Sequence, residues 1–480
     1  MYFNFLHKTA CAILCAGLFG CVVGPNFKAP EPVPGTDDSK LFTREQLSNN
    51  SIDQSLKQSI SANWWKSYRS PKIDKLVERA QKKNPNVDVA IANLKAAQES
   101  VNAQRGLFFP AVSLGYNVNR QNNGAVISPT LASGQTIFTL HTAQLSVGFV
   151  PDIFGLNRRQ VESLDALAVS QNYLLAASQI SIATNVVAAA IQHAVLEDQI
   201  RVVNEAVKAG KVQLNYLQKL KDSGYSSGFD LATQEVTYAQ ALAQLPPLQK
   251  QLEQTKDLLS FLCGELPNES FALPSLNEIA VPQSLPLTLP SQLVDQRPDI
   301  QVAIEQVRSS NALIGVATAN MLPQFSITAS LGFTKDMLAG LLSNDNRVWG
   351  VNGGILQPLF QGGALRARKR GAEAQKDAAL AQYRVVVLTA FQNVADVLYA
   401  LDADERGLSA NVQAEQASEK LFLMAQKQFD LGYSSGLNLL TVKQSYLQAS
   451  LARIATYGTY LGDTVSLYQA LGGGWTKTPD

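Results

Sequence analysis

Two short segments of the chain, VSLGYNVN and FSITASLGF, alternate between apolar residues and small or polar ones. A period of two is typical of a β-strand that has one apolar face. Each segment is followed by a second, less regular one, so the pattern predicts strand pairs at 111–150 and 323–358. The apolar face of the first strand would consist of Val112, Leu114, Tyr116 and Val118.

Most of the remaining chain has apolar residues at helical spacing. Val394, Leu401 and Leu408 recur at the heptad interval, which is typical of coiled-coil packing. Pro246 and Pro247 should break or kink the helix in which they lie, because proline has no backbone N–H to donate. We expect helices at about 72–105, 157–222 and 229–262, and again at about 298–320, 364–430 and 437–470.

The same order of elements occurs twice because the chain contains an internal duplication. NPNVDVAI matches RPDIQVAI, FPAVS matches LPQFS, and KLKDSGYSSGFDL matches KQFDLGYSSGLNL, always in the same order. Repeats on this scale organise a whole fold. We therefore divide the chain into a signal peptide (1–20), an N-terminal segment (21–71), repeat 1 (72–262), a linker (263–297), repeat 2 (298–470) and a C-terminal tail (471–480).

The repeated phrase GYSSG would form the turn between two long antiparallel helices in each repeat. Its first glycine suits the left-handed conformation that ends a helix. Ser227 and Asp230 have the spacing of a capping box, which Asn438 weakens in the second copy. Turn chemistry alone explains the motif, but two near-identical turns favour a shared role at the tips. The tip residues are Gly224, Tyr225, Ser226, Ser227 and Gly228, and Gly432, Tyr433, Ser434, Ser435 and Gly436.

Four predicted strands are too few to close a membrane barrel. Bacterial barrels start at eight strands, and an open edge in lipid would leave backbone groups unpaired. If these strands span a membrane, the chain must therefore associate with further copies of itself. The alternative is a soluble protein that carries two β-hairpins on a helical stalk, but the alternating segments carry almost no charge, which favours the membrane.

The N-terminus has the layout of a secretory signal, with an apolar run and then small residues before Cys21. LFGC resembles a bacterial lipobox, which would make Cys21 the lipidated first residue of the mature chain; a signal peptide with a chance cysteine is the alternative. Val22 favours delivery to the outer membrane. Cys263 would be the remaining cysteine of the mature chain and is expected to be a small buried apolar residue.

The bulk composition argues against several other classes of protein. A net charge of +1 argues against a nucleic-acid partner. No stretch after the N-terminus supplies the roughly 20 apolar residues that a membrane-spanning helix needs. The three histidines form no catalytic or zinc motif, and no phosphate-binding loop is present. We therefore expect no enzyme, no metal site and no cofactor beyond the lipid on Cys21.

Several long motifs, in order, resemble the outer-membrane factors of tripartite efflux systems, in the lipoprotein branch of the TolC-like superfamily. They are CVVGPNFKAP, NWWKSYRSPKIDKLVERAQKKNPNVDVAIANLKAAQ, LPSQLVDQRPDIQVAIEQVRSSNALIGVATANMLPQFSITASLGF and LYQALGGGW. The resemblance implies a mixed α and β membrane protein. It would be a homotrimer, with a twelve-stranded β-barrel continuous with a long twelve-helix α-barrel and a mixed equatorial domain.

The same resemblance implies the partners and the function. The expected function is an exit duct for small toxic compounds, working with a periplasmic adaptor (membrane fusion) protein and an inner-membrane pump of RND type. The tips would meet the adaptor, and Asp222, Asp230, Asp430, Tyr225 and Tyr433 would help to hold the entrance closed. The alternative for these acids is exposed helix-end charge. The alternatives for the whole chain are the channel of a type I protein-secretion system and a periplasmic coiled-coil adaptor.

Basic residues follow the second strand of each pair. They are Arg158 and Arg159 in repeat 1, and Arg366, Arg368, Lys369 and Arg370 in repeat 2. Attraction of anions or lipid headgroups would explain them, but the favoured interpretation is a solvated charged collar.

Overall fold

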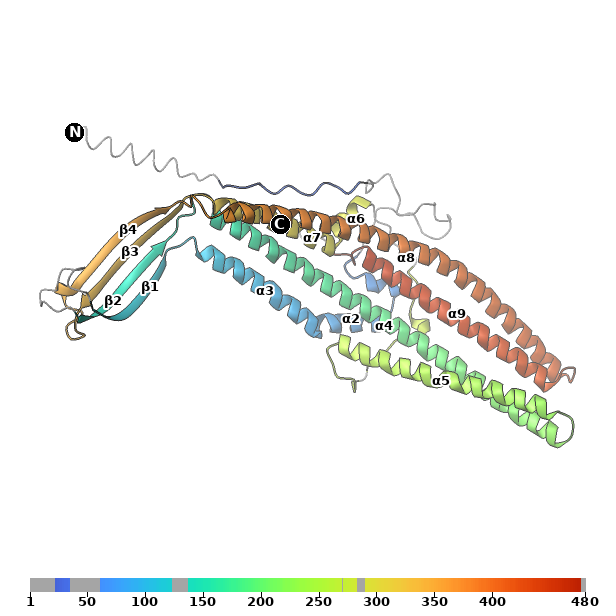
Figure 1. Ribbon diagram of the computed structural model, residues 1–480. Helices are drawn as coiled ribbons and strands as arrows, with labels where there is room; N and C mark the ends of the chain where they lie inside the picture. The colour runs from blue at the N-terminus through green and yellow to red at the C-terminus, as the bar shows by residue number, and fades with distance from the viewer. Residues whose placement is uncertain (1–21, 35–60, 123–136, 270, 283–289, 476–480) are drawn as a thin grey trace. The chain divides into compact units, whose positions relative to one another are not determined.

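The computed structural model describes residues 22–34, 61–122, 137–269, 271–282 and 290–475 (Figure 1). The chain divides into two compact units. Unit 1 contains both strand pairs and consists of Met1–Pro30, Leu94–Gln171 and Ala303–Tyr383. Unit 2 contains both helical turns and consists of Glu31–Asn93, Asn172–Val302 and Arg384–Asp480. Each unit thus takes equivalent segments from both repeats.

Unit 1 is built on one antiparallel sheet, whose strands lie where the alternating pattern predicted them. The order along the sheet is β1-β2-β3-β4, so β1 and β4 have unpaired edges within the described chain. The strands are β1 (Ala111–Asn122), β2 (Ile137–Phe149), β3 (Gln324–Lys335) and β4 (Arg347–Leu356).

The helices before the strand pairs differ in one respect from the prediction. A single helix was expected at about 72–105, but the chain forms α2 (Pro71–Lys83) and α3 (Pro85–Gly106), with Asn84 extended between them. The prediction was wrong here because a residue before proline is pushed out of the helical region. The Asn84 amide then caps α3 by accepting from the Asn86 N–H (2.9 Å) and donates to the Leu262 carbonyl (2.8 Å).

The long helices of each repeat form as expected. α4 (Leu156–Asp222) is followed by α5 (Gly228–Leu262), and α8 (Ala364–Asp430) by α9 (Gly436–Ala470). α4 and α8 have 67 residues each, or about 100 Å at the helical rise. The remaining elements are η1 (Trp64–Tyr68), η2 (Leu276–Glu278), α6 (Pro290–Gln296), α7 (Pro298–Ala319) and η3 (Asn344–Asn346).

The two prolines of α5 do not break the helix, which runs through Pro246 and Pro247 without interruption. Each proline deprives a carbonyl one turn earlier of its donor. Those carbonyls belong to Leu242 and Ala243, which are exposed, so water can take the place of the missing N–H groups.

The core of unit 2 joins the N-terminal segment to the end of α9. Trp64 stacks on Tyr468 with ring centroids 4.9 Å apart. The hydroxyl of the fully buried Tyr68 bonds to Thr464 Oγ1 at 2.8 Å. Cys263 is buried as predicted, and burial raises the pKa of its thiol to about 11, so the thiol is unreactive.

α4 and α8 each contain a stretch long and apolar enough to cross a membrane, judged by length and composition alone. The expectation of no such stretch was therefore wrong on that measure. Half of the stretch in α4 is buried inside the protein, and a buried core helix passes the same test.

Candidate functional site

Both GYSSG turns have the same backbone hydrogen bonds. In the first, the Tyr225 N–H donates to the Leu220 carbonyl (2.8 Å) and the Gly224 N–H to the Lys221 carbonyl (2.9 Å). The second repeats these bonds from Tyr433 and Gly432 at the same distances. This is the Schellman ending of a helix, and it needs a left-handed residue. The two glycines supply it, with φ of +77° and +76°, as the sequence predicted.

The serines of each turn start the returning helix. Ser227 Oγ accepts from the Asp230 N–H (3.1 Å), and the Asp230 carboxylate accepts from the Ser227 N–H (3.1 Å), which confirms the predicted capping box. The Ser227 hydroxyl also donates to the Asp230 carboxylate (2.7 Å), and this bond, followed by the one from the Ser227 N–H, lowers the pKa of Asp230. In the second turn only the forward bond forms, from the Asn438 N–H to Ser435 Oγ (3.2 Å).

The tips present aromatic side chains to solvent. Tyr225 and Tyr433 are each 83% exposed, and Phe229 and Leu431 are nearly as open. The backbone and serine groups are thus used within the turn, while the tyrosine rings remain available to a partner. Aromatic side chains in such positions are typical of protein interfaces.

The two acids before the turns bond within their own helices. Asp222 accepts from the Gln218 amide (2.8 Å) and Asp430 from the Gln426 amide (3.0 Å). These bonds span four residues along one helix face. Asp230 is engaged in the capping box. The three proposed gate acids therefore lie within one turn of a tip but do not contact one another in the described chain.

Sequence reasoning missed a contact between the repeats close to the second tip. A Cβ added to Gly436 would lie 3.6 Å from Tyr216 Cε1 and 3.4 Å from Phe429 Cε2. Tyr216, near the end of α4, therefore packs against the start of α9. Only its place in the repeat, about two turns before GYSSG, could have drawn attention to it.

The sheet of unit 1 has one apolar and one polar face. Leu114, Leu145, Leu331 and Trp349 lie opposite one another across the four strands. The neighbouring row consists of Ser113, Ser146, Ser330 and Gly350. Residues directly opposite share a face of the sheet. Leu114 and Trp349 are 80% and 72% exposed, so the apolar face is not covered within the chain.

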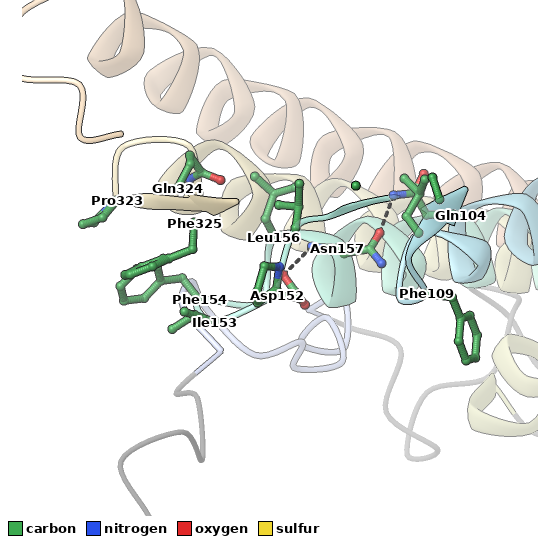
Figure 2. Close-up of a pocket in the computed structure, with 15 residues that line it drawn as sticks. Gln104, Phe109, Asp152, Ile153, Phe154, Leu156, Asn157, Pro323, Gln324 and Phe325 are labelled. Atoms are coloured by element: carbon green, nitrogen blue, oxygen red, sulfur yellow. Dashed lines mark hydrogen bonds between the residues drawn. The ribbon is translucent and has the colours of Figure 1, made fainter. Parts of the chain in front are cut away.

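A cavity of about 320 Å³ lies within unit 1, where the strands meet α3 and α4 (Figure 2). Its walls are mostly apolar and include Val150, Ile153, Phe154 and Phe325. The rings of Phe154 and Phe325 are tilted towards each other, with centroids 6.4 Å apart.

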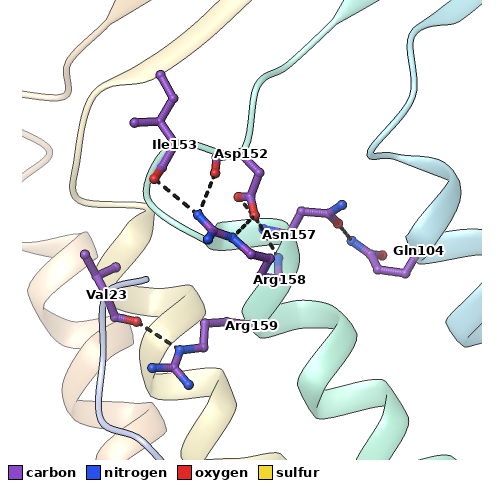
Figure 3. A network of polar contacts seen from close by, with 7 residues as sticks. All are labelled: Val23, Gln104, Asp152, Ile153, Asn157, Arg158 and Arg159. Atoms are coloured by element: carbon purple, nitrogen blue, oxygen red, sulfur yellow. Dashed lines mark hydrogen bonds and ion pairs between the residues drawn. The ribbon is translucent and has the colours of Figure 1, made fainter. Parts of the chain in front are cut away.

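A polar network fixes the loop that forms one wall of this cavity (Figure 3). The Asp152 carboxylate accepts from the N–H groups of Asn157 (2.8 Å) and Arg158 (3.0 Å), and it pairs with the Arg158 guanidinium. Arg159 is only 4% exposed and donates to the Val23 carbonyl (3.0 Å). The solvated-collar interpretation is therefore wrong for Arg159, which pairs with Glu162 on its own helix (2.6 Å) and also bonds to residues far away in the sequence.

Cys21 lies outside the described residues, so the structure leaves its lipidation a prediction. His193 is packed in the protein interior, and its Nε2 atom lies 3.8 Å from a carboxylate oxygen of Glu197. Among the described residues, no group of three or more His, Cys, Asp or Glu side chains could hold a metal ion.

A duplicated chain with long helical hairpins and an open sheet that exposes an apolar face has the features of an outer-membrane channel. The sequence profile of the outer membrane efflux protein family matches residues 76–265 and again 289–473. The chain therefore belongs to this family of transport proteins and is located in the outer membrane of a Gram-negative bacterium.

Similar proteins support this assignment over nearly the whole chain. The antibiotic efflux pump outer membrane protein ArpC of Pseudomonas putida is 28% identical, over 95% of this chain and 93% of its own. The pyoverdine export outer membrane protein OpmQ of the same species is 27% identical, over 86% and 88%. The solved outer-membrane channel OprN is 27% identical and has a TM-score of 0.81, over 95% of this chain and all of its own.

Proposed function

We propose that the chain is the exit duct of a tripartite efflux pump of RND type, which passively conducts small toxic compounds from the periplasm to the exterior. The observation that carries the proposal is the sheet of unit 1, with its uncovered apolar face and its two unpaired edges. Such a sheet is stable in lipid only when neighbouring copies pair with both edges.

Three copies would place twelve strands in one closed barrel. The four long helices of each copy, α4, α5, α8 and α9, would together give twelve helices around one tunnel. The N-terminal segment (21–71), the linker (263–297) and the C-terminal tail (471–480) would form the equatorial belt. Cys21 would carry the lipid that anchors each copy, and no other cofactor is proposed. In this arrangement the channel needs no specific binding site for its cargo, and the pump selects the cargo.

The tips would form the periplasmic entrance and contact the adaptor protein. The exposed rings of Tyr225 and Tyr433 support this role. We also propose that these tyrosines, with Asp222, Asp230 and Asp430, hold the resting entrance closed by contacts between copies. The double variant Asp430→Ala with Tyr433→Phe should raise the resting single-channel conductance in a planar bilayer. An unchanged conductance would remove the gate role and leave the exit-duct function standing.

The function is tested by susceptibility of a strain that lacks the gene. The strain is complemented with the wild type or with Gly432→Pro, and exposed to antibiotics, dyes, detergents and metal salts. Proline cannot adopt the left-handed φ of +76°, so the tip should be disrupted while the strands are untouched. We expect sensitisation that only the wild type rescues. No sensitisation to any compound, together with a loss of secreted proteins, would instead indicate a type I secretion channel.

A further inference from the structure

The first described residues, Val22–Phe27, form an extended N-terminal strap that is docked on unit 1. Arg159 lies beneath the strap and donates to three of its oxygen atoms: the carbonyls of Val23 (3.0 Å) and Gly24 (3.1 Å), and Asn26 Oδ1 (2.8 Å). Asn311 donates to the Pro25 carbonyl (2.9 Å). A buried guanidinium bonded in this way indicates a built binding site for the strap rather than a loose tether.

Close packing also holds the strap. Gly24 has φ of +94°, and a Cβ there would lie 2.4 Å from Gly315 Cα. A Cβ on Gly155 would lie 2.8 Å from Val22 Cγ1. At both places the backbones meet only because a side chain is missing.

The N-terminal end of the strap lies beside the cavity, at the junction of the strands and helices of unit 1. The Val23 N–H donates to the carbonyl of Phe154 (3.1 Å), a residue whose ring lines the cavity. The docked Val22 leads the chain to the edge of the cavity, and a peptide bond places consecutive Cα atoms only about 3.8 Å apart. A group attached to the Cys21 sulfur or α-amine would then start close to the apolar walls of the cavity.

The cavity also offers one hydrogen-bond donor that the described chain does not use. Asn157 is only 7% exposed, and its Nδ2 atom has no partner among the described residues. Its Oδ1 atom accepts from Gln104 Nε2, which fixes the direction of the amide (Figure 2). A buried amide N–H without an acceptor is costly, so a ligand with a carbonyl oxygen would stabilise the site.

We propose that this cavity binds an acyl chain attached to Cys21, with an acyl carbonyl oxygen accepting from Asn157 Nδ2. The proposal rests on the proposed lipidation of Cys21. The apolar walls fit a hydrocarbon chain, the free donor fits its ester or amide carbonyl, and the volume lies at the lower end of the range for small-molecule sites. The lipid would then be a bound ligand of unit 1, and Arg159 would be the residue that positions it.

Photocrosslinking of the lipid tests the proposal. Cells that express the full-length protein are fed a palmitate analogue that carries an alkyne and a diazirine. The protein is purified in detergent, illuminated, digested and mapped by mass spectrometry. We expect label on Cys21 and cross-links in residues 148–157 and 323–325, with neither in Cys21→Ser.

Two variants separate the strap from the carbonyl contact. Arg159→Met should lower these cross-links at least ~10-fold without removing the label, because it takes charge-assisted hydrogen bonds from the strap. Asn157→Asp retains the acceptor for Gln104, loses the free N–H and adds a carboxylate that repels an acyl carbonyl oxygen, so it should also lower them.

Gly24→Val changes the strap and provides a check if Arg159→Met folds poorly. Arg105→Met is the matched control, because Arg105 has an exposed ion pair with Asp165 and touches neither strap nor ligand.

Cys21 could be labelled while its cross-links lie only outside these segments, to lipid, detergent or another copy. That result would overturn the proposal but leave the lipidation and the channel function intact. Cross-links that persist unchanged in Arg159→Met, Gly24→Val and Asn157→Asp would also overturn it. An unlabelled wild type would remove the lipidation and this inference together, while the susceptibility panel would still decide the channel function.

Discussion

Gly224 and Gly432 are the residues on which the two tips depend most directly. Each has a left-handed φ, and no atom lies within 4 Å of the position that a Cβ would occupy. A side chain there would meet no steric obstacle from neighbours, so the whole cost of substitution would be backbone strain. The turn at each tip is therefore required by backbone conformation and not by packing.

Gly224→Ala and Gly432→Ala should each destabilise their turn by about 1 kcal/mol, because L-residues are disfavoured at positive φ. The amide hydrogens of Tyr225 and Tyr433 should then exchange about five-fold faster. Hydrogen exchange read by mass spectrometry checks this. Gly228→Ala is the control: it has an ordinary φ and open space, so the exchange should stay the same. Equal effects at all three glycines would contradict the account.

His193 should make unit 2 sensitive to acid. Burial lowers its pKa from 6.5, although the nearby Glu197 carboxylate acts in the opposite direction. The unfolded chain therefore binds the proton more readily, and the stability present above pH 6.5 is lost as the pH falls. The thermal midpoint should drop between about pH 7.5 and about pH 5.5. His193→Leu should show a smaller drop, and an identical drop would refute this role.

Asp404 should have the opposite effect on unit 2, whose stability it should lower as the pH rises. Burial, then the hydrogen bond and the negative charge of Asp463, raise its pKa to about 6. Stability from the protonated pair is thus complete below the unfolded value of 3.8 and is lost as the pH rises through 6. Asp404→Asn should raise the thermal midpoint at about pH 7.5 more than at about pH 5. Asp402→Asn, which loses an ion pair with Arg406, should not show this pH dependence.

At the scale of elements, α4 and the turn between α8 and α9 depend on each other. Tyr216 of α4 is 38% exposed, and its ring lies beside Gly436, at the start of α9. The contact joins repeat 1 to the tip of repeat 2, whereas a Cβ added to the equivalent Gly228 would meet no neighbour within 4 Å. The two tips are therefore near-identical in sequence but are supported differently.

Tyr216→Ala should loosen the second turn by about 1 kcal/mol, the order of an aromatic contact. Exchange of the amide hydrogens at 431–436 should increase, while that at 223–228 should not. Tyr225→Ala is the matched control, since an 83% exposed ring supports nothing within the chain. If Tyr225→Ala loosened the second turn as much as Tyr216→Ala, the contact between Tyr216 and Gly436 would not be what stabilises that turn.

The elements that could be predicted from the sequence are those whose signals are local. β1 and β3 follow from strict alternation, the ends of α4 and α8 from glycines, and the starts of α5 and α9 from capping serines. The break at Asn84 was missed although Pro85 indicates it, and the continuity of α5 through two prolines depends on exposure, which sequence does not reveal. Arg159 was misread because the residues that bury it include the strap, which lies far away along the chain.

At the scale of the whole molecule, the duplication explains why one chain is incomplete. Each repeat supplies one strand pair and one long helical hairpin, and the two pairs join into a sheet that still has two free edges. Its apolar face needs lipid, and its edges need strands from other copies. The fold class could be predicted from the sequence because repeated motifs set it, whereas the cavity could not, because segments distant in the sequence form its walls.

The most direct test of this account is the number of copies in the assembled protein. Native mass spectrometry of the full-length chain, extracted from outer membranes in mild detergent, gives that number without labels. The account predicts three copies, which together supply twelve strands. A single copy would contradict it, because the sheet would then remain open in the membrane. Two copies would give eight strands and contradict the trimeric channel.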